Sequence, residues 1–332
     1  MKLQPKAQLF EYLLGLSMLL QTFFPTFLTS TWSFLAYIFI TYFKSRLEGF
    51  RVNYIFFTIL QLLLFSSSNL LFRLVILTGV YLTIVCFPLY ENPIPSGEYL
   101  VGYRRFDLNG EGKVTGAIYY PTTQTTKDVN YGHNTGAWER FAEIIIFYAR
   151  VRKGKHAPRF FYKFIFNCFE FQYLGVNLNS KPADLEKFPV VVFSHGLAGH
   201  IHAYSTQIKE WVSHGYIVFS VDHDEKISVR MESLDEYNEY VKQRAEQLVE
   251  RREAVVEVLN WVHSPEKLRD LFAGAQIPVD YEKIILAGHS FGGATACEVA
   301  SYDKRVTGGL VLLDPWLAPC AENVLTKDLN KP

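Results

Sequence analysis

The residues best suited to chemistry in this chain are Gly288-His289-Ser290-Phe291-Gly292, a Gly-x-Ser-x-Gly motif. In this pattern the serine occupies a strained turn between a strand and a helix, so its hydroxyl projects from the sheet edge and can attack a carbonyl carbon. The flanking glycines are needed because side chains there would collide with the neighbouring strand and helix. Ser290 is therefore predicted to be a nucleophile; the alternative is a glycine-rich turn with an idle serine.

The segments on either side of the motif favour the nucleophile. Residues 283–287 have the composition of a short buried strand in a parallel sheet. Residues 294–300 are compatible with a helix, whose N-terminus would face the negative charge that develops in acyl transfer. Strand, turn and helix in this order form a nucleophile elbow, which is the structural context that the motif requires. The helix after the turn is called the elbow helix below.

Two further stretches could complete the site. The buried strand predicted at 188–194 is followed by His195 and Gly196, and this glycine would let the amide of Leu197 face a substrate oxygen. For the His195 side chain we expect a structural role in ordering the loop. Asp314 ends the strand that follows the elbow helix, where an acid can orient a catalytic histidine. The alternative for this aspartate is an ordinary turn cap.

The remaining elements predict an α/β fold with a mostly parallel sheet and helices on both faces. Four more strands are expected, at 99–106, 115–120, 216–222 and 308–313. A long amphipathic helix is expected over 235–262, because apolar residues recur there at three- and four-residue steps with charges on the opposite face.

The composition argues against several functions. With 33 Lys+Arg against 33 Asp+Glu, the net charge is +0, which gives no case for nucleic-acid binding. Four widely spaced cysteines form neither a metal-ligand pattern nor a dense disulfide framework: Cys86, Cys168, Cys297 and Cys320. No metal or other cofactor is predicted.

The first 90 residues are far more apolar than the rest and predict a membrane domain. Four apolar stretches lie there, at 9–28, 31–43, 54–70 and 74–90. A spanning helix needs about 20 apolar residues, so three or four spans are possible. Lysines and arginines cluster before the first stretch, between the second and third, and after the fourth. With four spans these three clusters would share one side of the membrane, which favours four spans. The sequence thus predicts a multi-pass membrane protein with a cytosolic catalytic domain and the lipid bilayer as a partner.

A proline-rich linker at 91–97 is predicted to divide this membrane domain, 1–90, from a catalytic domain, 98–332. Residues 138–174 combine basic and aromatic side chains. They have two interpretations: a helical cap packed on the core, or an interfacial segment that places rings among lipid headgroups.

From Gly97 to Pro332 the motifs resemble one family, the platelet-activating factor acetylhydrolases. The resemblance is carried, in chain order, by Glu98–Gly102, Val192–Leu197, Ser213–Val218 with Val221–His223, Val241–Ala245, Gly288–Thr295 and Leu313–Trp316. Several motifs in the right order are far more specific than the serine motif alone. The resemblance implies an α/β-hydrolase fold for this region and does not extend to the apolar N-terminal stretches.

The resemblance implies a calcium-independent serine esterase of the 1-alkyl-2-acetylglycerophosphocholine type. Such an enzyme removes acetyl groups, other short acyl groups or oxidised acyl groups from the sn-2 position of phospholipids. A phospholipid is therefore the expected substrate. By the family's pattern, Ser290 is the nucleophile, Asp314 the triad acid, and the amides of Leu197 and Phe291 form the oxyanion hole. The sequence indicates no particular protein partner.

One departure from the family concerns the catalytic base. The family's histidine follows the acid, beyond two more strands, whereas no histidine follows His289 here. The sequence therefore predicts a C-terminally incomplete hydrolase domain that is nearly inactive and poorly folded alone, because the strand before Asp314 would be a bare apolar sheet edge. Of the histidines present, His223 is the first candidate base. The alternatives are a general carboxylesterase or thioesterase of the same fold and an inactive pseudoenzyme.

Overall fold

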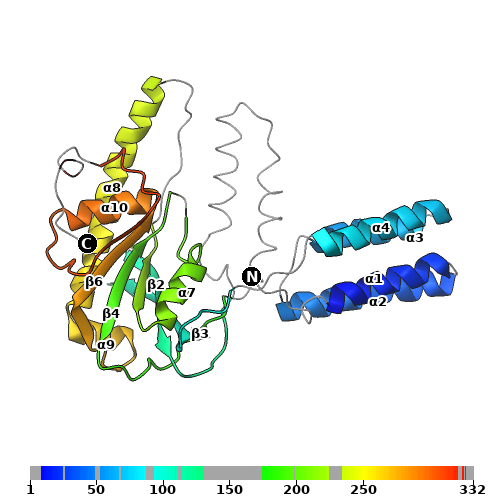
Figure 1. The fold of residues 1–332 in the computed structure, drawn as a ribbon, viewed down its shortest axis with the longest axis horizontal. Coiled ribbons are helices and arrows are strands. Elements are labelled where there is room, and N and C mark those ends of the chain that lie inside the picture. The colour runs from blue at the N-terminus through cyan, green and yellow to red at the C-terminus, as the bar shows by residue number, and fades with distance from the viewer. Residues whose placement is uncertain are drawn as a thin grey trace. The chain divides into compact units, whose positions relative to one another are not determined.

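The computed structural model describes residues 9–24, 27–48, 53–66, 69–86, 93–108, 110, 114–129, 174–197, 199–223, 234–320, 324 and 326. The chain divides into two compact units. In the described residues, the first unit consists of the N-terminal helices, and the second contains the sheet with the helices packed on it (Figure 1).

Among the described residues, the first unit contains four helices: α1 Leu9–Phe23, α2 Phe27–Glu48, α3 Asn53–Ser66 and α4 Leu70–Cys86. Their buried apolar side chains meet in a small core made of Leu14, Met18, Tyr37, Phe57, Leu64, Ile76 and Val80. Polar contacts also join the helices, because Gln61 Nε2 donates to Gln21 Oε1 at 2.8 Å and Arg73 Nη1 donates to the Gln21 carbonyl at 2.8 Å.

Among the helices that the structure describes, none combines the length and the apolar character needed to cross a membrane. Helices α1, α3 and α4 contain 15, 14 and 17 residues, fewer than the roughly 20 required. Helix α2 contains 22 residues, but its last turns carry Lys44, Arg46 and Glu48. The prediction of a multi-pass membrane protein is therefore wrong, and with it the basis for a cytosolic catalytic domain.

Apart from Leu174, the basic and aromatic segment at 138–174 falls outside the described residues, so neither of its interpretations is tested. The chain on its two sides is joined in the second unit. The Leu174 amide donates to the Val129 carbonyl at 2.9 Å, and the Asp128 carboxylate accepts from the amide of Val176 at 2.9 Å. Val129 and Leu174 therefore lie next to each other in the second unit.

A seven-stranded sheet forms the centre of the second unit (Figure 1). Its strands are β1 Leu100–Leu108, β2 Val114–Thr122, β3 Asn177–Leu178, β4 Phe188–Ser194, β5 Ile217–Val221, β6 Val279–His289 and β7 Gly309–Leu313. Their order is β3-β1-β2-β5-β4-β6-β7, and of these strands β2 alone runs antiparallel to its neighbours. The predicted mostly parallel α/β sheet is thus confirmed, while the two-residue strand β3 was not predicted.

Helices cover both faces of this sheet: α7 Ser205–Ser213 on one, α8 Leu234–Val262 and α10 Phe291–Ala300 on the other; α9 spans Pro265–Leu271. Neighbouring side chains of a strand point to opposite faces. Val192 of β4 joins the core cluster that contains Leu259 of α8. The next residue, Phe193, contacts Trp211 of α7 with ring centroids 6.1 Å apart. Helices α8 and α10 pack side by side (Figure 1).

The register of the parallel strands brings their carboxyl ends together. Ser194 at the end of β4 pairs with both Val221 of β5 and Gly288 of β6, and His289 pairs with Leu313 of β7. The residues that follow these strands therefore share one edge of the sheet, where open α/β sheets bind ligands. They are His195, Asp222, Ser290 and Asp314.

Candidate active site

Ser290 occupies the turn between β6 and α10 in a strained conformation, with φ 52° and ψ −117°. A positive φ is uncommon for any residue other than glycine and persists only where its surroundings enforce it. Here the Ser290 amide donates to the Leu313 carbonyl at 3.0 Å, and the Ser290 carbonyl accepts from the Trp316 amide at 2.9 Å. Within the described part of the chain, no hydrogen bond engages the Ser290 hydroxyl.

The two glycines of the motif lie where no side chain fits. A Cβ on Gly288 would overlap the carbonyl of Gly292, one turn further on. A Cβ on Gly292 would overlap the carbonyl oxygen of Ser194, at the end of β4. The elbow helix therefore approaches the neighbouring strand at backbone distance, which is the collision argument made from the sequence.

We expect Gly292→Ala to destabilise the protein by about 1–3 kcal/mol, because the added methyl group must displace the backbone of β4. Denaturant unfolding measures this effect. Gly79→Ala in α4 is a suitable control, since its Cβ would meet Leu60 at an ordinary contact distance of 3.7 Å. Equal stabilities of the two variants would contradict the close approach.

Leu197 and Phe291, the two expected oxyanion donors, lie near each other. Phe291 is the first residue of α10 and is fully buried in an apolar cluster, and Leu197 packs against the same cluster. The first amides of a helix have no partner within the helix. Among the described residues, the Phe291 amide indeed donates to no oxygen, so it is free to bind a substrate atom.

Tyr204 connects the elbow to the loop after β4. Its hydroxyl lies 2.7 Å from His289 Nδ1 and accepts from the Gly196 amide at 3.4 Å. Burial raises the pKa of Tyr204, while the Gly196 amide and the charge of Arg251 partly offset this increase. The hydroxyl thus stays protonated and links the Gly196 amide to the His289 side chain.

Asp314 directly follows β7 with φ 45°, next to the elbow because Leu313 pairs with His289. Its side chain is exposed, and among the described residues it has no ion-pair or hydrogen-bond partner. The loop behind it is anchored by Trp316, whose ring lies 5.7 Å from Phe291 and 5.7 Å from Tyr240 of α8. The structure therefore places Asp314 beside Ser290, with none of the described histidines bonded to either.

The histidines at this edge bind other partners. His223 Nε2 lies 2.9 Å from Ser194 Oγ, and His195 Nδ1 lies 2.8 Å from the Gly196 carbonyl oxygen, the structural role expected for His195. None of the described histidines bonds to Ser290 or Asp314. His133 and His156 lie outside the described residues.

Arg251, like Tyr204, lies at this site and was not singled out from the sequence. The sequence predicted charges on the face of this helix opposite its apolar residues, yet the Arg251 side chain is only 2% exposed. On α8 the buried positions 244, 248, 251, 255, 258 and 262 recur at three- and four-residue steps, and two of them are arginines. An arginine on the apolar stripe of a helix is the signal that would have found it.

The site shows no arrangement for a metal ion: in the ranges that the structure describes, no three His, Cys, Asp or Glu side chains are grouped to bind one.

Comparison with known proteins identifies relatives of this chain. A family model described as "Platelet-activating factor acetylhydrolase, isoform II" matches residues 86–229 and 222–332. The platelet-activating factor acetylhydrolase of Cavia porcellus is 34% identical over 167 residues, which cover 43% of this chain and 38% of that protein. The one of Canis lupus familiaris is 26% identical over 279 residues, covering 71% and 57%. The chain thus spans 38% and 57% of the length of these two relatives.

Among solved structures, a ferulic acid esterase from Streptomyces cinnamoneus is similar at 19% identity and a TM-score of 0.42. The match covers 65% of this chain and 59% of that esterase.

Proposed function

The chain belongs to the platelet-activating factor acetylhydrolase isoform II family, and on this premise we propose that it is a serine-dependent lipid esterase of the α/β-hydrolase fold. The observation that carries the proposal is the backbone of Ser290. It is held at φ 52° between β6 and α10, with its hydroxyl unengaged by the described residues. We also propose that the N-terminal region ends at residue 90 and that the catalytic domain begins at residue 98.

In the proposed reaction, Ser290 Oγ attacks the carbonyl carbon of an ester and transfers its proton to a general base. The amides of Leu197 and Phe291 donate hydrogen bonds to the oxyanion of the tetrahedral intermediate. The bond between the carbonyl carbon and the alcohol oxygen then breaks, and the alcohol leaves with the proton from the base. Water hydrolyses the acyl-serine by the same steps, with Asp314 orienting the base throughout.

The base is the one part of this mechanism that the described residues do not supply. His223, the first candidate from the sequence, is bonded to Ser194 rather than to Ser290. This observation favours the second candidate function, an inactive relative that binds lipid without hydrolysing it. We propose the esterase because the strained serine, the unengaged Phe291 amide and Asp314 are all assembled at one edge.

For the substrate we propose phospholipids with short or oxidised sn-2 acyl groups, on the family membership. The test is hydrolysis of phosphatidylcholines of graded sn-2 length by the purified protein, together with a long-chain acyl thioester. We expect the rate to fall steeply as the sn-2 chain lengthens. Faster turnover of the thioester or of long chains would indicate a general esterase, and no turnover of any substrate would indicate the inactive relative.

A further inference from the structure

The buried guanidinium of Arg251 reaches from α8 to the loop that follows β4. Arg251 Nη1 donates to the His195 carbonyl at 2.7 Å and lies 3.4 Å from Ser194 Oγ. Arg251 Nη2 donates to the Gly196 carbonyl at 3.5 Å. One side chain thus bridges two consecutive carbonyls of this loop, a fork geometry that arginine offers and lysine does not.

These carbonyl contacts determine where the Leu197 amide points. In a trans peptide, the C=O and the following N–H point in opposite directions, and no cis peptide is found in the described residues. The Gly196 carbonyl is held by three donors, because His195 Nδ1 and the Gly199 amide bind it at 2.8 and 2.9 Å besides Arg251. The N–H of Leu197 must then point away from Arg251.

The contacts of the other ring nitrogen of His195 show that Nδ1 carries the proton that it donates to the Gly196 carbonyl. His195 Nε2 accepts from the His223 amide at 3.2 Å, so that nitrogen has no proton and Nδ1 carries it. The two side chains that donate to the Gly196 carbonyl are buried, because His195 and Arg251 are 0% and 2% exposed. Their packing therefore fixes the positions of both donors.

Arg251 also contacts the second oxyanion donor. Its guanidinium carbon lies 4.4 Å from the ring centroid of Phe291, a distance suited to a cation–π interaction. The same side chain therefore holds the peptide before Leu197 and packs on Phe291, whose amide begins α10.

We propose that Arg251 is a positioning residue for the oxyanion hole, which sets the orientation of the Leu197 amide through the Gly196 carbonyl and fixes Phe291 by stacking. The catalytic part of this assignment rests on the proposed function. The structural part, the ordering of residues 195–197 and 199, does not.

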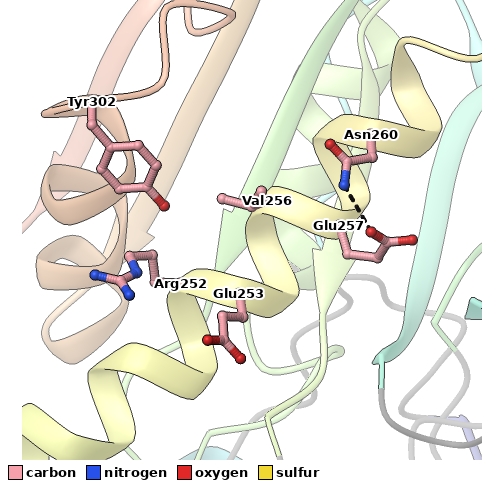
Figure 2. A pocket seen from close by; sticks show the side chains of 6 residues that line it. All are labelled: Arg252, Glu253, Val256, Glu257, Asn260 and Tyr302. Carbon is pink, nitrogen blue, oxygen red and sulfur yellow. Dashed lines mark hydrogen bonds between the residues drawn. The ribbon is translucent and has the colours of Figure 1, made fainter.

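The test compares Arg251→Met and Arg251→Lys with the control Arg252→Met in the full chain. Arg252 is the next residue of the same helix, but it lines a depression of about 430 Å³ between α8 and Tyr302 (Figure 2). For Arg251→Met we expect kcat on a short-chain ester to fall roughly 10- to 100-fold with little change in KM, somewhat less than the loss of a donor itself. Arg251→Lys, which keeps the charge without the fork, should show an intermediate loss, and Arg252→Met none.

Two readouts separate positioning from general damage. Methylguanidinium added to Arg251→Ala should restore part of kcat, which it would not do for a protein that is merely destabilised. Amide hydrogen exchange in residues 195–199 should accelerate in Arg251→Met and not in Arg252→Met. If the parent protein hydrolyses no ester but this exchange still accelerates, the proposed function fails and the positioning role stands. Unchanged exchange in both Arg251→Met and Arg251→Lys would overturn the positioning role.

Discussion

Replacing Ser290 with alanine is expected to lower ester hydrolysis by about 10⁶-fold, the loss typical of removing a triad nucleophile. It should also abolish covalent labelling by a fluorophosphonate probe. The physical reason is that no other described hydroxyl combines a strained elbow backbone with access to the unengaged amide of Phe291. The measurement is kcat together with identification of the labelled peptide.

Ser194→Ala is the matched control for this prediction. Ser194 is the serine at this edge with a histidine partner, His223 at 2.9 Å, so on hydrogen bonding alone it would look like the nucleophile. However, it ends strand β4 and is only 2% exposed. Labelling that survives Ser290→Ala and disappears in Ser194→Ala would show that the assignment is wrong.

The backbone strain gives the same residue a second test. A non-glycine residue at φ 52° costs on the order of 1–3 kcal/mol. Ser290→Gly should therefore be more stable than Ser290→Ala, while both are inactive.

Much of the sheet unit could be predicted because its signals are local. The strand at 188–194 and the helix at 235–262 were predicted within one residue of β4 and α8, since apolar periodicity and length define them. The two-residue strand β3 at Asn177–Leu178 carries no such pattern. It forms because β1 offers an edge on which it pairs, which is a tertiary property.

The N-terminal prediction failed because hydropathy along the sequence does not set where a helix ends. The stretch at 9–28 yields a helix of 15 residues, Leu9–Phe23. Inside the first unit, Gln21 and Arg73 are buried against each other's helices, with the Arg73 guanidinium on the Gln21 carbonyl at 2.8 Å. A window average counts these residues as interruptions and cannot show that they are partners.

The site was predictable where a short motif determines the geometry, and not where partners are distant in sequence. The collisions that exclude side chains at Gly288 and Gly292 follow from the elbow itself. The contact of Arg251 with the carbonyls of residues 195 and 196 joins positions more than 50 apart. Helical periodicity shows the stripe to which Arg251 belongs, but only the structure shows what faces it.

Asp314→Asn is expected to reduce kcat by about 10⁴-fold while leaving the free energy of unfolding nearly unchanged, because an asparagine cannot support a protonated histidine during acyl transfer. The small effect on stability follows from its surroundings. The Asp314 side chain is exposed and has no ion-pair or hydrogen-bond partner among the described residues. Removing its charge should therefore change the free energy of unfolding very little. The measurements are kcat on a short-chain ester and denaturant unfolding.

Asp303→Asn is the control that should behave in the opposite way. Asp303 is 8% exposed and accepts three hydrogen bonds from the Arg305 side chain, at 2.7 to 3.2 Å. Burial raises its pKa, but the hydrogen bonds and charge of Arg305 lower it by more, so the carboxylate is stabilised in the folded state. Its removal should therefore lower stability, by about 1–3 kcal/mol, and leave kcat intact.

If Asp314→Asn retains full activity, the acid lies elsewhere, and Asp222, 3.8 Å from His195 Nε2 at the same sheet edge, is the next residue to replace.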